Sequence, residues 1–308
     1  MIFGSKKGPE LNNRRVRYND LRSYFTSYSM LIPFLSMFFI FTLVPIVSAI
    51  ALSFSDFNML ELPSWVGWAN YRRLIFEDDV LLIALKNTLI FAIITGPVSY
   101  IFAFVFAWLI NEMPSKMRVL MTIIFYAPSV SGNVYFLWQY IFSSDSYGLV
   151  NGILISNGII DEPILWFTDP NYNLIIIIIV QLWLSLGVSF LAFIAGLQSI
   201  DRTQYEAGAI DGIRNRFQEL WHITLPNMKA MLLFGAVMQI SGAFSVGTIT
   251  QALSGGYMSV RYSTLTIINH MTDYGTVRYE MGYASAISVI LFIMVYLSKK
   301  LVFRLLKW

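Results

Sequence analysis

Long apolar stretches dominate the chain, and six of them contain no Asp, Glu, Lys or Arg. They are 18 to 27 residues long and cover Leu31–Phe54, Leu89–Ile110, Val119–Phe142, Leu174–Ile200, Ala230–Ser254 and Met281–Ser298. A helix of about 20 residues crosses the roughly 30 Å hydrocarbon core of a bilayer. Backbone groups in lipid must find their hydrogen bonds within the chain, which favours helices over barrel strands at this length. The pattern therefore predicts an all-α integral membrane protein with six transmembrane helices.

Composition supports this prediction. Of the 308 residues, 56% are apolar and only 13% charged, with a mean hydropathy of +0.62. About a quarter of the residues in a typical soluble domain are charged, so a soluble globular protein is excluded. We expect a cytoplasmic segment at 1–30, which could form an interfacial amphipathic helix, followed by a six-span domain at 31–305. The chain has no cysteine, which excludes disulfides and thiolate metal sites.

The distribution of positive charge predicts the orientation. Sixteen of the 21 Lys and Arg residues fall on one side if the N-terminus, the 111–118 turn, the 201–229 loop and the C-terminal tail share that side. Cytoplasmic loops carry an excess of Lys and Arg, so both termini are expected in the cytoplasm of a cell-membrane protein. The same topology accounts for the net charge of +3 without a nucleic-acid partner.

The loop between the fourth and fifth predicted spans, residues 201–226, has a pattern of its own. A short helix is expected over Arg202–Asp211, capped by Asp201 or Thr203, and Gly212 allows the chain to reverse. A second helix from Arg214 to about Trp221 would place Phe217, Leu220 and Trp221 on one apolar face. Pro226 would then open the fifth span. Such a helical pair, joined directly to two spans, suits contact with another protein.

At these residues the chain resembles the membrane subunits of binding-protein-dependent ABC importers, whose signature is E-A-A-x-x-x-G, about nine residues, then I-x-L-P. The matching residues are Glu206-Ala207-Gly208, Gly212 and Ile223-x-Leu225-Pro226. Two differences stand out: Gly208 replaces the second alanine, and ten residues rather than nine separate Gly212 from Ile223. The extra residue lets the second helix rotate relative to the family pattern. Val66–Tyr71, Gly148–Asn151 and Gly196–Ile200 are similar to the carbohydrate-uptake, maltose-type branch.

The resemblance implies a mechanism. In that family the loop forms a coupling helix in a groove of an ATPase subunit. By the match, the ATPase-coupling residues are Glu206, Ala207, Gly208, Asp211, Gly212, Phe217, Ile223, Leu225 and Pro226. The implied partners are a second homologous permease, two ATPase subunits and an extracellular solute-binding protein. The chain has no G-x-x-x-x-G-K-[ST] phosphate loop, so no cofactor is expected in it; ATP and Mg would be bound by the ATPases. The alternative for Glu206 is an ordinary solvated carboxylate.

The polar residues within the predicted spans are uncharged. Ion-coupled carriers generally need ionisable residues within the membrane, so energy is expected to enter from outside the bilayer. Amides can hydrogen-bond sugar hydroxyls and aromatic rings can cover the apolar sugar face. The candidates for a substrate path are Asn133, Tyr135, Trp138, Gln139, Gln181, Trp183, Gln239 and Ser241. For each, the alternative is a hydrogen bond between helices.

No residue pattern predicts catalysis or a metal site. His222 and His270 lie far apart in the sequence, and no Ser/His/Asp or paired-carboxylate arrangement falls at membrane depth. We therefore expect a non-enzymatic permease subunit that imports a sugar, most simply an oligosaccharide. The alternatives are another solute, such as glycerol phosphate or a polyamine, or an ATP-independent carrier or channel.

Overall fold

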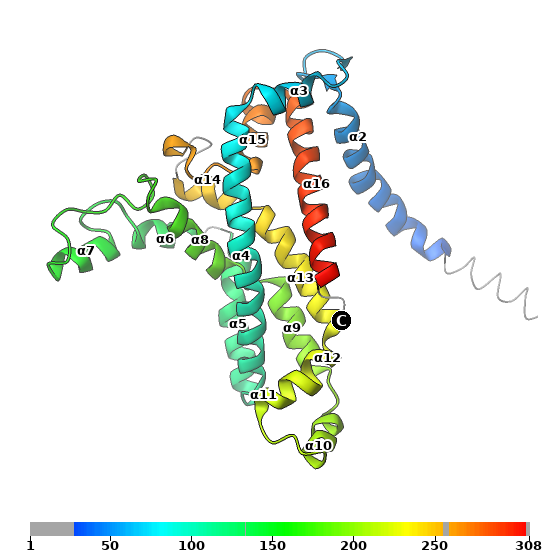
Figure 1. Cartoon of the computed structure of the whole chain (residues 1–308), viewed down its shortest axis with the longest axis vertical. Coiled ribbons are helices and arrows are strands. Elements are labelled where there is room, and N and C mark those ends of the chain that lie inside the picture. Colours follow the sequence, from blue (N-terminus) through cyan, green and yellow to red (C-terminus); the bar gives the residue numbers. More distant parts are fainter. Residues whose placement is uncertain (1–27, 133, 255–258, 306–308) are drawn as a thin grey trace, which may run out of the picture.

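The computed structural model of the chain describes residues 28–132, 134–254 and 259–305, and these are largely helical (Figure 1). Four helices are long and apolar enough to cross a membrane by themselves: Tyr28–Leu52, Asp79–Asn111, Asn173–Gln198 and Met281–Leu305. Two bent pairs, Ser115–Val130 with Tyr135–Ile141 and Arg216–Asn227 with Lys229–Phe244, raise the number to six if each pair is one span. The described residues thus hold four to six candidate spans. The predicted interfacial helix falls almost wholly outside them.

The elements range from single turns to the 33-residue helix α4. In chain order they are the π-helical turn η1 (Phe39–Leu43), α2 (Val44–Leu52), β1 (Ser55–Asp56), β2 (Ser64–Trp65), α3 (Ala69–Phe76), α4 (Asp79–Asn111), α5 (Ser115–Val130), α6 (Tyr135–Ile141), α7 (Leu149–Ser156), α8 (Asn173–Leu184), α9 (Val188–Gln198), α10 (Arg202–Ile210), α11 (Arg216–Glu219), the π-helical turn η2 (Leu220–Thr224), α12 (Leu225–Asn227), α13 (Lys229–Phe244), α14 (Thr248–Ser254), the 3-10 turn η3 (Val260–Tyr262), α15 (Ile267–Thr272), the π-helical turn η4 (Asp273–Val277) and α16 (Met281–Leu305). The two-residue strands β1 and β2 pair antiparallel, a small departure from the all-helical prediction.

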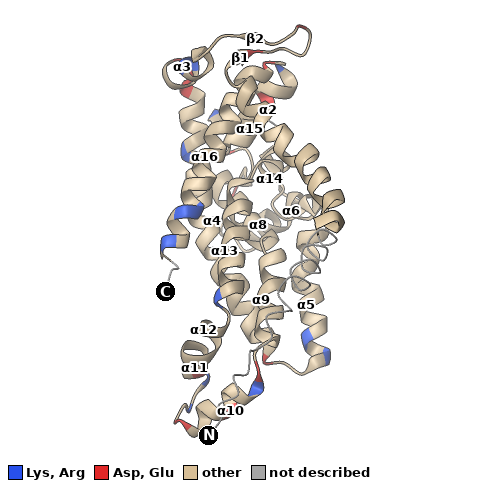
Figure 2. Cartoon of the chain, turned by 90° about the vertical axis from the view of Figure 1, so that its right-hand side faces the viewer, with Lys and Arg blue, Asp and Glu red and all other residues tan. Residues whose placement is uncertain are grey.

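Helices α4, α9 and α13 pack together at the centre of the bundle (Figure 1). Phe193 of α9 is fully buried there, and Gly235 of α13 faces its ring. A Cβ atom added at Gly235 would lie 2.3 Å from Phe193 Cζ, so only glycine permits this approach. Charged residues lie in the loops and near helix ends (Figure 2). The arrangement agrees with a helical bundle whose middle is surrounded by hydrocarbon.

The first long helix stands apart from this bundle. Its residues are almost all exposed, and its C-terminal part, α2, packs on α16 while the remainder diverges from the body (Figure 1). An exposed apolar surface of this length cannot face water in a stable protein. Lipid or another subunit must therefore cover it.

Two predicted spans are broken within their length. The segment Val119–Phe142 divides into α5 and α6, which meet at 89°; α5 contains Pro128 and ends at Val130, where Ser131 is extended. The segment Ala230–Ser254 is interrupted after Phe244. There Gly247 approaches the side chain of Ile268 so closely that an added Cβ would lie 2.5 Å from its Cγ2 atom.

A polar arm leaves the bundle between α6 and α8, and one side chain holds it together (Figure 1). Asn151 is fully buried. Its Nδ2 atom donates to the carbonyl oxygens of Ser143, Asp145 and Ile164 at 3.0, 3.1 and 3.0 Å. Its Oδ1 atom accepts from the Ile164 amide at 3.1 Å and from Trp166 Nε1 at 2.9 Å. The Asn151 side chain thus joins the segment before α7 to the segment after it, and its own donor and acceptor groups are both hydrogen-bonded, as is usual for a buried polar group.

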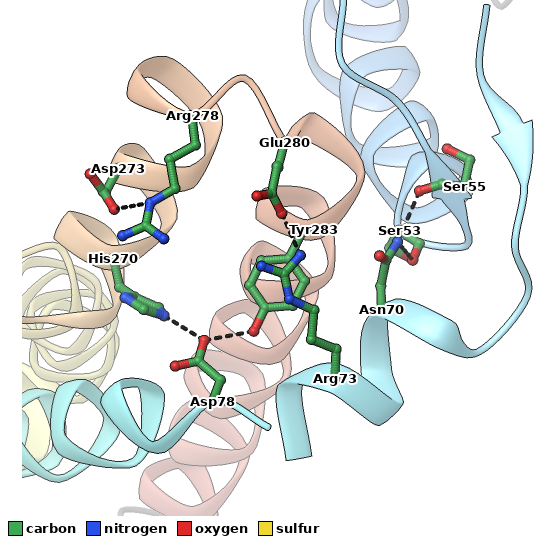
Figure 3. Close-up of polar contacts among 10 residues, drawn as sticks. All are labelled: Ser53, Ser55, Asn70, Arg73, Asp78, His270, Asp273, Arg278, Glu280 and Tyr283. Carbon is green, nitrogen blue, oxygen red and sulfur yellow. Dashed lines mark hydrogen bonds and ion pairs between the residues drawn. The ribbon is translucent and has the colours of Figure 1, made fainter. Parts of the chain in front are cut away.

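At the end of the bundle opposite α10, Asp78 joins three helices (Figure 3). It caps α4 by accepting from the Leu81 amide at 2.9 Å. Its Oδ2 atom also accepts from His270 Nε2 of α15 at 2.8 Å and from the Tyr283 hydroxyl of α16 at 2.6 Å. Arg73 of α3 lies 4.3 Å from the centre of the Tyr283 ring. We call Asp78, His270 and Tyr283 the Asp78 clamp.

The hydrogen bonds of the Asp78 clamp favour the carboxylate. Burial by itself would raise the pKa of Asp78, but the bonds from His270, Tyr283 and the Leu81 amide outweigh it and lower that pKa to about 2. A carboxyl group whose folded-state pKa is lowered stabilises the fold above its unfolded-state pKa. That stability is lost as the pH falls through the folded-state value.

We expect the fold to lose stability between about pH 4 and about pH 2, as Asp78 is protonated. Thermal unfolding of the purified protein in detergent, followed by tryptophan fluorescence, measures this. Asp78→Asn should unfold at a lower temperature near neutral pH and lose part of the acid dependence. Asp161→Asn, in the exposed arm, is the matched control. The same acid dependence in Asp78→Asn and the unchanged protein would contradict the interpretation.

Candidate functional site

The 201–226 loop projects beyond the end of the helical bundle, with α10 farthest out (Figure 1). Helix α10 begins at Arg202, and Asp201 is its cap, because the Asp201 side chain accepts from the Thr203 amide at 3.0 Å. It ends at Ile210, one residue before the predicted end. Gly212 follows with a φ of +94°, a conformation that favours glycine. The predicted reversal at Gly212 is confirmed.

The second helix begins later than predicted. Asn215 caps it, since its side chain accepts from the Gln218 amide at 2.8 Å, so the helix starts at Arg216 rather than Arg214. It then continues through η2 and α12 as one helix, Arg216–Asn227, which meets α13 at 80°. Pro226 therefore lies in the last turn before this bend and does not open the fifth span, which begins at Lys229.

A continuous seam joins α10 to the η2–α12 segment. Gln204, Tyr205 and Gly208 form one face of α10, and they meet Asn227, Thr224 and Ile223, respectively. Asn227 Nδ2 donates to Gln204 Oε1 at 2.6 Å, and the Tyr205 and Thr224 hydroxyls are 3.0 Å apart. Gly208 and Ile223 are buried between these polar contacts. The seam fixes the two helices of the loop relative to each other.

Glu206 lies on the side of α10 away from the seam. At about 100° per residue, it is roughly 150° from the middle of the Gln204–Tyr205–Gly208 face. Its side chain is exposed, as is that of Ile210, at 87%. Phe217 and Trp221, predicted to form an apolar face, are also exposed, at 74% and 58%. The loop thus presents an acidic and apolar surface; we call Glu206, Ile210, Phe217 and Trp221 the distal face.

Most of the remaining predicted coupling residues are exposed. Ala207, Asp211, Gly212 and Pro226 are exposed, and Leu225 is half-buried. Ile210 had not been singled out from the sequence, although its place one turn after Glu206 puts it on the same side of α10. That spacing was the signal that could have identified it.

The loop is also attached to the end of α4. Arg216 Nη2 lies 3.2 Å from Glu112 Oε2, and the rings of Phe217 and Trp108 are 5.8 Å apart. The ion pair is solvent-exposed and contributes little by itself. Together with the bend into α13, these contacts connect the loop to two long helices.

The candidate substrate-path residues fall into two groups. Three of them bond within the protein: Gln139 donates to the Ala252 carbonyl at 2.7 Å, Gln239 to Ser189 Oγ at 2.7 Å, and Ser241 to the Val237 carbonyl at 2.9 Å. For Gln139 and Gln239 these bonds join different helices, which is the alternative considered above. Asn133 lies outside the described residues.

Aromatic candidates from α6 and α8 come together. The Trp138 and Trp183 rings are 5.4 Å apart in a T-shaped arrangement, and Trp138 stacks on Phe142 at 5.9 Å. Tyr135 packs against the same cluster. The Trp138 Nε1 atom is buried, and neither it nor the side chain of Gln181 has a hydrogen-bond partner in the described part of the chain.

The two histidines serve separate contacts. His270 belongs to the Asp78 clamp, and His222 Nδ1 lies 3.0 Å from the Gln218 carbonyl oxygen. Over residues 28–132, 134–254 and 259–305, no group of three His, Asp or Glu side chains is arranged to hold a metal ion.

Comparison with known proteins places these features in a family. Residues 115–307 match the family described as the binding-protein-dependent transport system inner membrane component. The probable ABC transporter permease YesP of Bacillus subtilis (strain 168) is 30% identical over 95% of this chain and 92% of its own length. The lactose transport system permease LacF of Rhizobium radiobacter is 30% identical over 91% of this chain and 92% of its own.

Two solved structures of transporters have a chain with a similar fold. A bacterial ABC transporter involved in the import of the acidic polysaccharide alginate has a chain with a TM-score of 0.70 and 25% identity. The similarity covers 93% of this chain and 98% of that one. A structure of the alginate transporter with an alginate pentasaccharide-bound periplasmic protein has a TM-score of 0.71 at 24% identity and shows the same fold.

Proposed function

Since the chain belongs to the family of binding-protein-dependent transport system inner membrane components, we propose that it forms half of the translocation pathway of an ATP-driven oligosaccharide importer. The other half would be a second, homologous permease. Two ATPase subunits would bind ATP and Mg, and an extracellular solute-binding protein would deliver the sugar. This chain would catalyse no reaction itself.

The distal face is the surface we propose for the ATPase. The observation that carries this proposal is its position: Glu206 is exposed on α10, which lies at one end of the described part of the chain, and the seam holds α10 to α12 at the bend into α13. An acidic side chain flanked by exposed apolar residues suits a groove with apolar walls and a basic group. Movement of the ATPases would reach α13 through the bend and α4 through Phe217 and Trp108.

The membrane topology follows from this assignment. If α10 meets an ATPase in the cytoplasm, the end of the bundle with the Asp78 clamp faces outward. The bent pair of α5 and α6 then counts as one span and α13 as another, with Arg216–Asn227 on the cytoplasmic side, which gives six spans and places both termini in the cytoplasm. The excess of Lys and Arg in the loops assigned to that side supports this orientation.

We expect Glu206→Lys to leave membrane insertion intact and to uncouple sugar uptake from ATP hydrolysis. Reversing the charge places a cation against the proposed basic groove, so uptake should fall about tenfold or more. Uptake and ATP hydrolysis by the complete reconstituted transporter measure both quantities. Glu162→Lys, exposed on the arm, is the control and should transport normally. Normal coupled uptake by Glu206→Lys would refute the assignment.

A substrate of neutral or weakly charged sugar units fits the residues within the spans. The six apolar stretches carry no charged side chain, whereas amide, indole and hydroxyl groups can bond to sugar hydroxyls. Relatives named for lactose and arabinooligosaccharides support an oligosaccharide. One relative, UgpA of Agrobacterium fabrum, is named for sn-glycerol-3-phosphate, which makes that solute the alternative to test.

The cognate solute-binding protein should bind an oligosaccharide with micromolar or better affinity. Calorimetric titration with neutral oligosaccharides, uronate oligosaccharides, sn-glycerol-3-phosphate and a polyamine distinguishes the candidates. Uptake of the bound sugar by the reconstituted complex completes the test. Binding of glycerol phosphate or a polyamine alone would overturn the sugar assignment while leaving the importer assignment intact.

Tyr135, Trp138, Gln181 and Trp183 are the residues we propose along the sugar path, because their polar groups are not committed to other helices. Gln139, Gln239 and Ser241 would instead hold helices in place. The perpendicular Trp138 and Trp183 rings form a corner against which a sugar ring can pack.

Trp138→Ala and Trp183→Ala are each expected to lower the rate of sugar transport about 2- to 10-fold, the loss expected for one aromatic contact. Transport by the complete reconstituted complex, normalised to the amount of assembled complex, is the measurement. Trp65→Ala, an exposed tryptophan of the β1–β2 hairpin, should transport normally. Unchanged transport in both variants would place the path elsewhere.

A further inference from the structure

Gly208 lies at the centre of the seam between α10 and the η2–α12 segment, where two isoleucine side chains converge on it. A Cβ atom added to Gly208 would lie 2.6 Å from Ile223 Cδ1 and 3.1 Å from Ile213 Cδ1. Ile223 is itself buried, with 8% of its surface exposed. Ile223 thus occupies space that any side chain at position 208 would need.

The hydrogen bonds at the end of α10 show which side chain would normally fill the space that Ile223 occupies beside Gly208. The Ile213 amide donates to the Gly208 carbonyl at 2.9 Å, and the Gly212 amide donates to the Ala209 carbonyl at 3.4 Å. This is the Schellman ending, in which the residue after the left-handed glycine usually packs against a side chain at the position of Gly208. Here that position has no side chain, and Ile223 enters from the second helix.

The π-helical turn η2 is where Ile223 acquires its position. The Leu225 amide donates to the Leu220 carbonyl, five residues back instead of four. A π-turn of this kind accommodates one additional residue without ending the helix. The loop has one residue more between Gly212 and Ile223 than the signature that it resembles. Thr224, in the same turn, meets Tyr205 across the seam.

We infer that Gly208 and the π-turn η2 are a matched pair of positioning elements: η2 absorbs the additional residue, and Gly208 admits the Ile223 side chain that this register brings to α10. The fit sets the orientation of α10, and therefore the direction in which Glu206 points. The inference rests on the proposed contact between the distal face and an ATPase. Gly208 in place of the signature alanine and the additional residue before Ile223 would then have one structural cause.

Gly208→Ala tests the fit in the complete reconstituted transporter. The added methyl group would lie 2.6 Å from Ile223 Cδ1 and must displace it within the buried seam. If this fit orients α10, as inferred, sugar transported per ATP hydrolysed should fall about fivefold or more. Ile223→Val removes the Cδ1 atom that the methyl group would meet. The double variant Gly208→Ala/Ile223→Val should recover coupling to within about twofold of Ile223→Val alone. Rescue would show that the clash with Ile223 causes the loss, and the ratio of transport to ATP hydrolysis in assembled complex would show that coupling and not stability is affected.

Gly242→Ala is the matched control, because an added Cβ there has no atom within 4 Å. Should Gly208→Ala reduce the amount of assembled complex, the same rescue by Ile223→Val must restore that amount. Normal coupling in Gly208→Ala, or a double variant no better than the single, would overturn the inference. Glu206→Lys separates the two hypotheses. If it uncouples transport while Gly208→Ala does not, only the inference fails; if neither uncouples, the proposed function fails.

Discussion

Hydrocarbon does not hydrogen-bond to a polypeptide, and the rest of this structure depends on that constraint. It restricts the candidate spans to helices and keeps charge at helix ends and in loops. The ion pairs of the described residues consequently lie at the two ends of the bundle. The Asp78 clamp joins α4, α15 and α16 at one end, and the seam orders the projecting loop at the other.

The projecting loop is built to behave as one piece with its spans. Polar contacts at Gln204 and Tyr205 flank the buried Gly208–Ile223 contact, so α10 has a defined orientation although it is short. A nine-residue helix is marginal by itself in water. Its partner is a longer helix, Arg216–Asn227, that bends directly into α13. A force applied at Glu206 can thus act on a span without first folding or unfolding the loop.

The candidate substrate-path residues differ in their hydrogen bonding although their chemistry is similar. Gln139 and Gln239 both reach other helices, and their amides are occupied by those bonds. The indole nitrogen of Trp138 is buried without such a bond. An unpaired buried donor is costly unless a ligand or water meets it, which supports the proposal that sugar contacts this corner of α6 and α8. Residue type alone could not separate the two groups.

The sequence by itself determined the class of protein, the approximate places of the spans, the Asp201 or Thr203 cap, the reversal at Gly212 and the loop that carries the family signature. These follow from local patterns: apolar length, capping chemistry and backbone freedom. Only the tertiary structure decided where α5 and α13 end, which amides are already bonded, and that Asp78 and Asn151 are hubs of hydrogen bonds. It also decided that Gly208 and Ile223 face inward while Glu206 and Ile210 face out. Those outcomes depend on atoms brought together from distant parts of the chain, and neither periodicity nor composition records such distances.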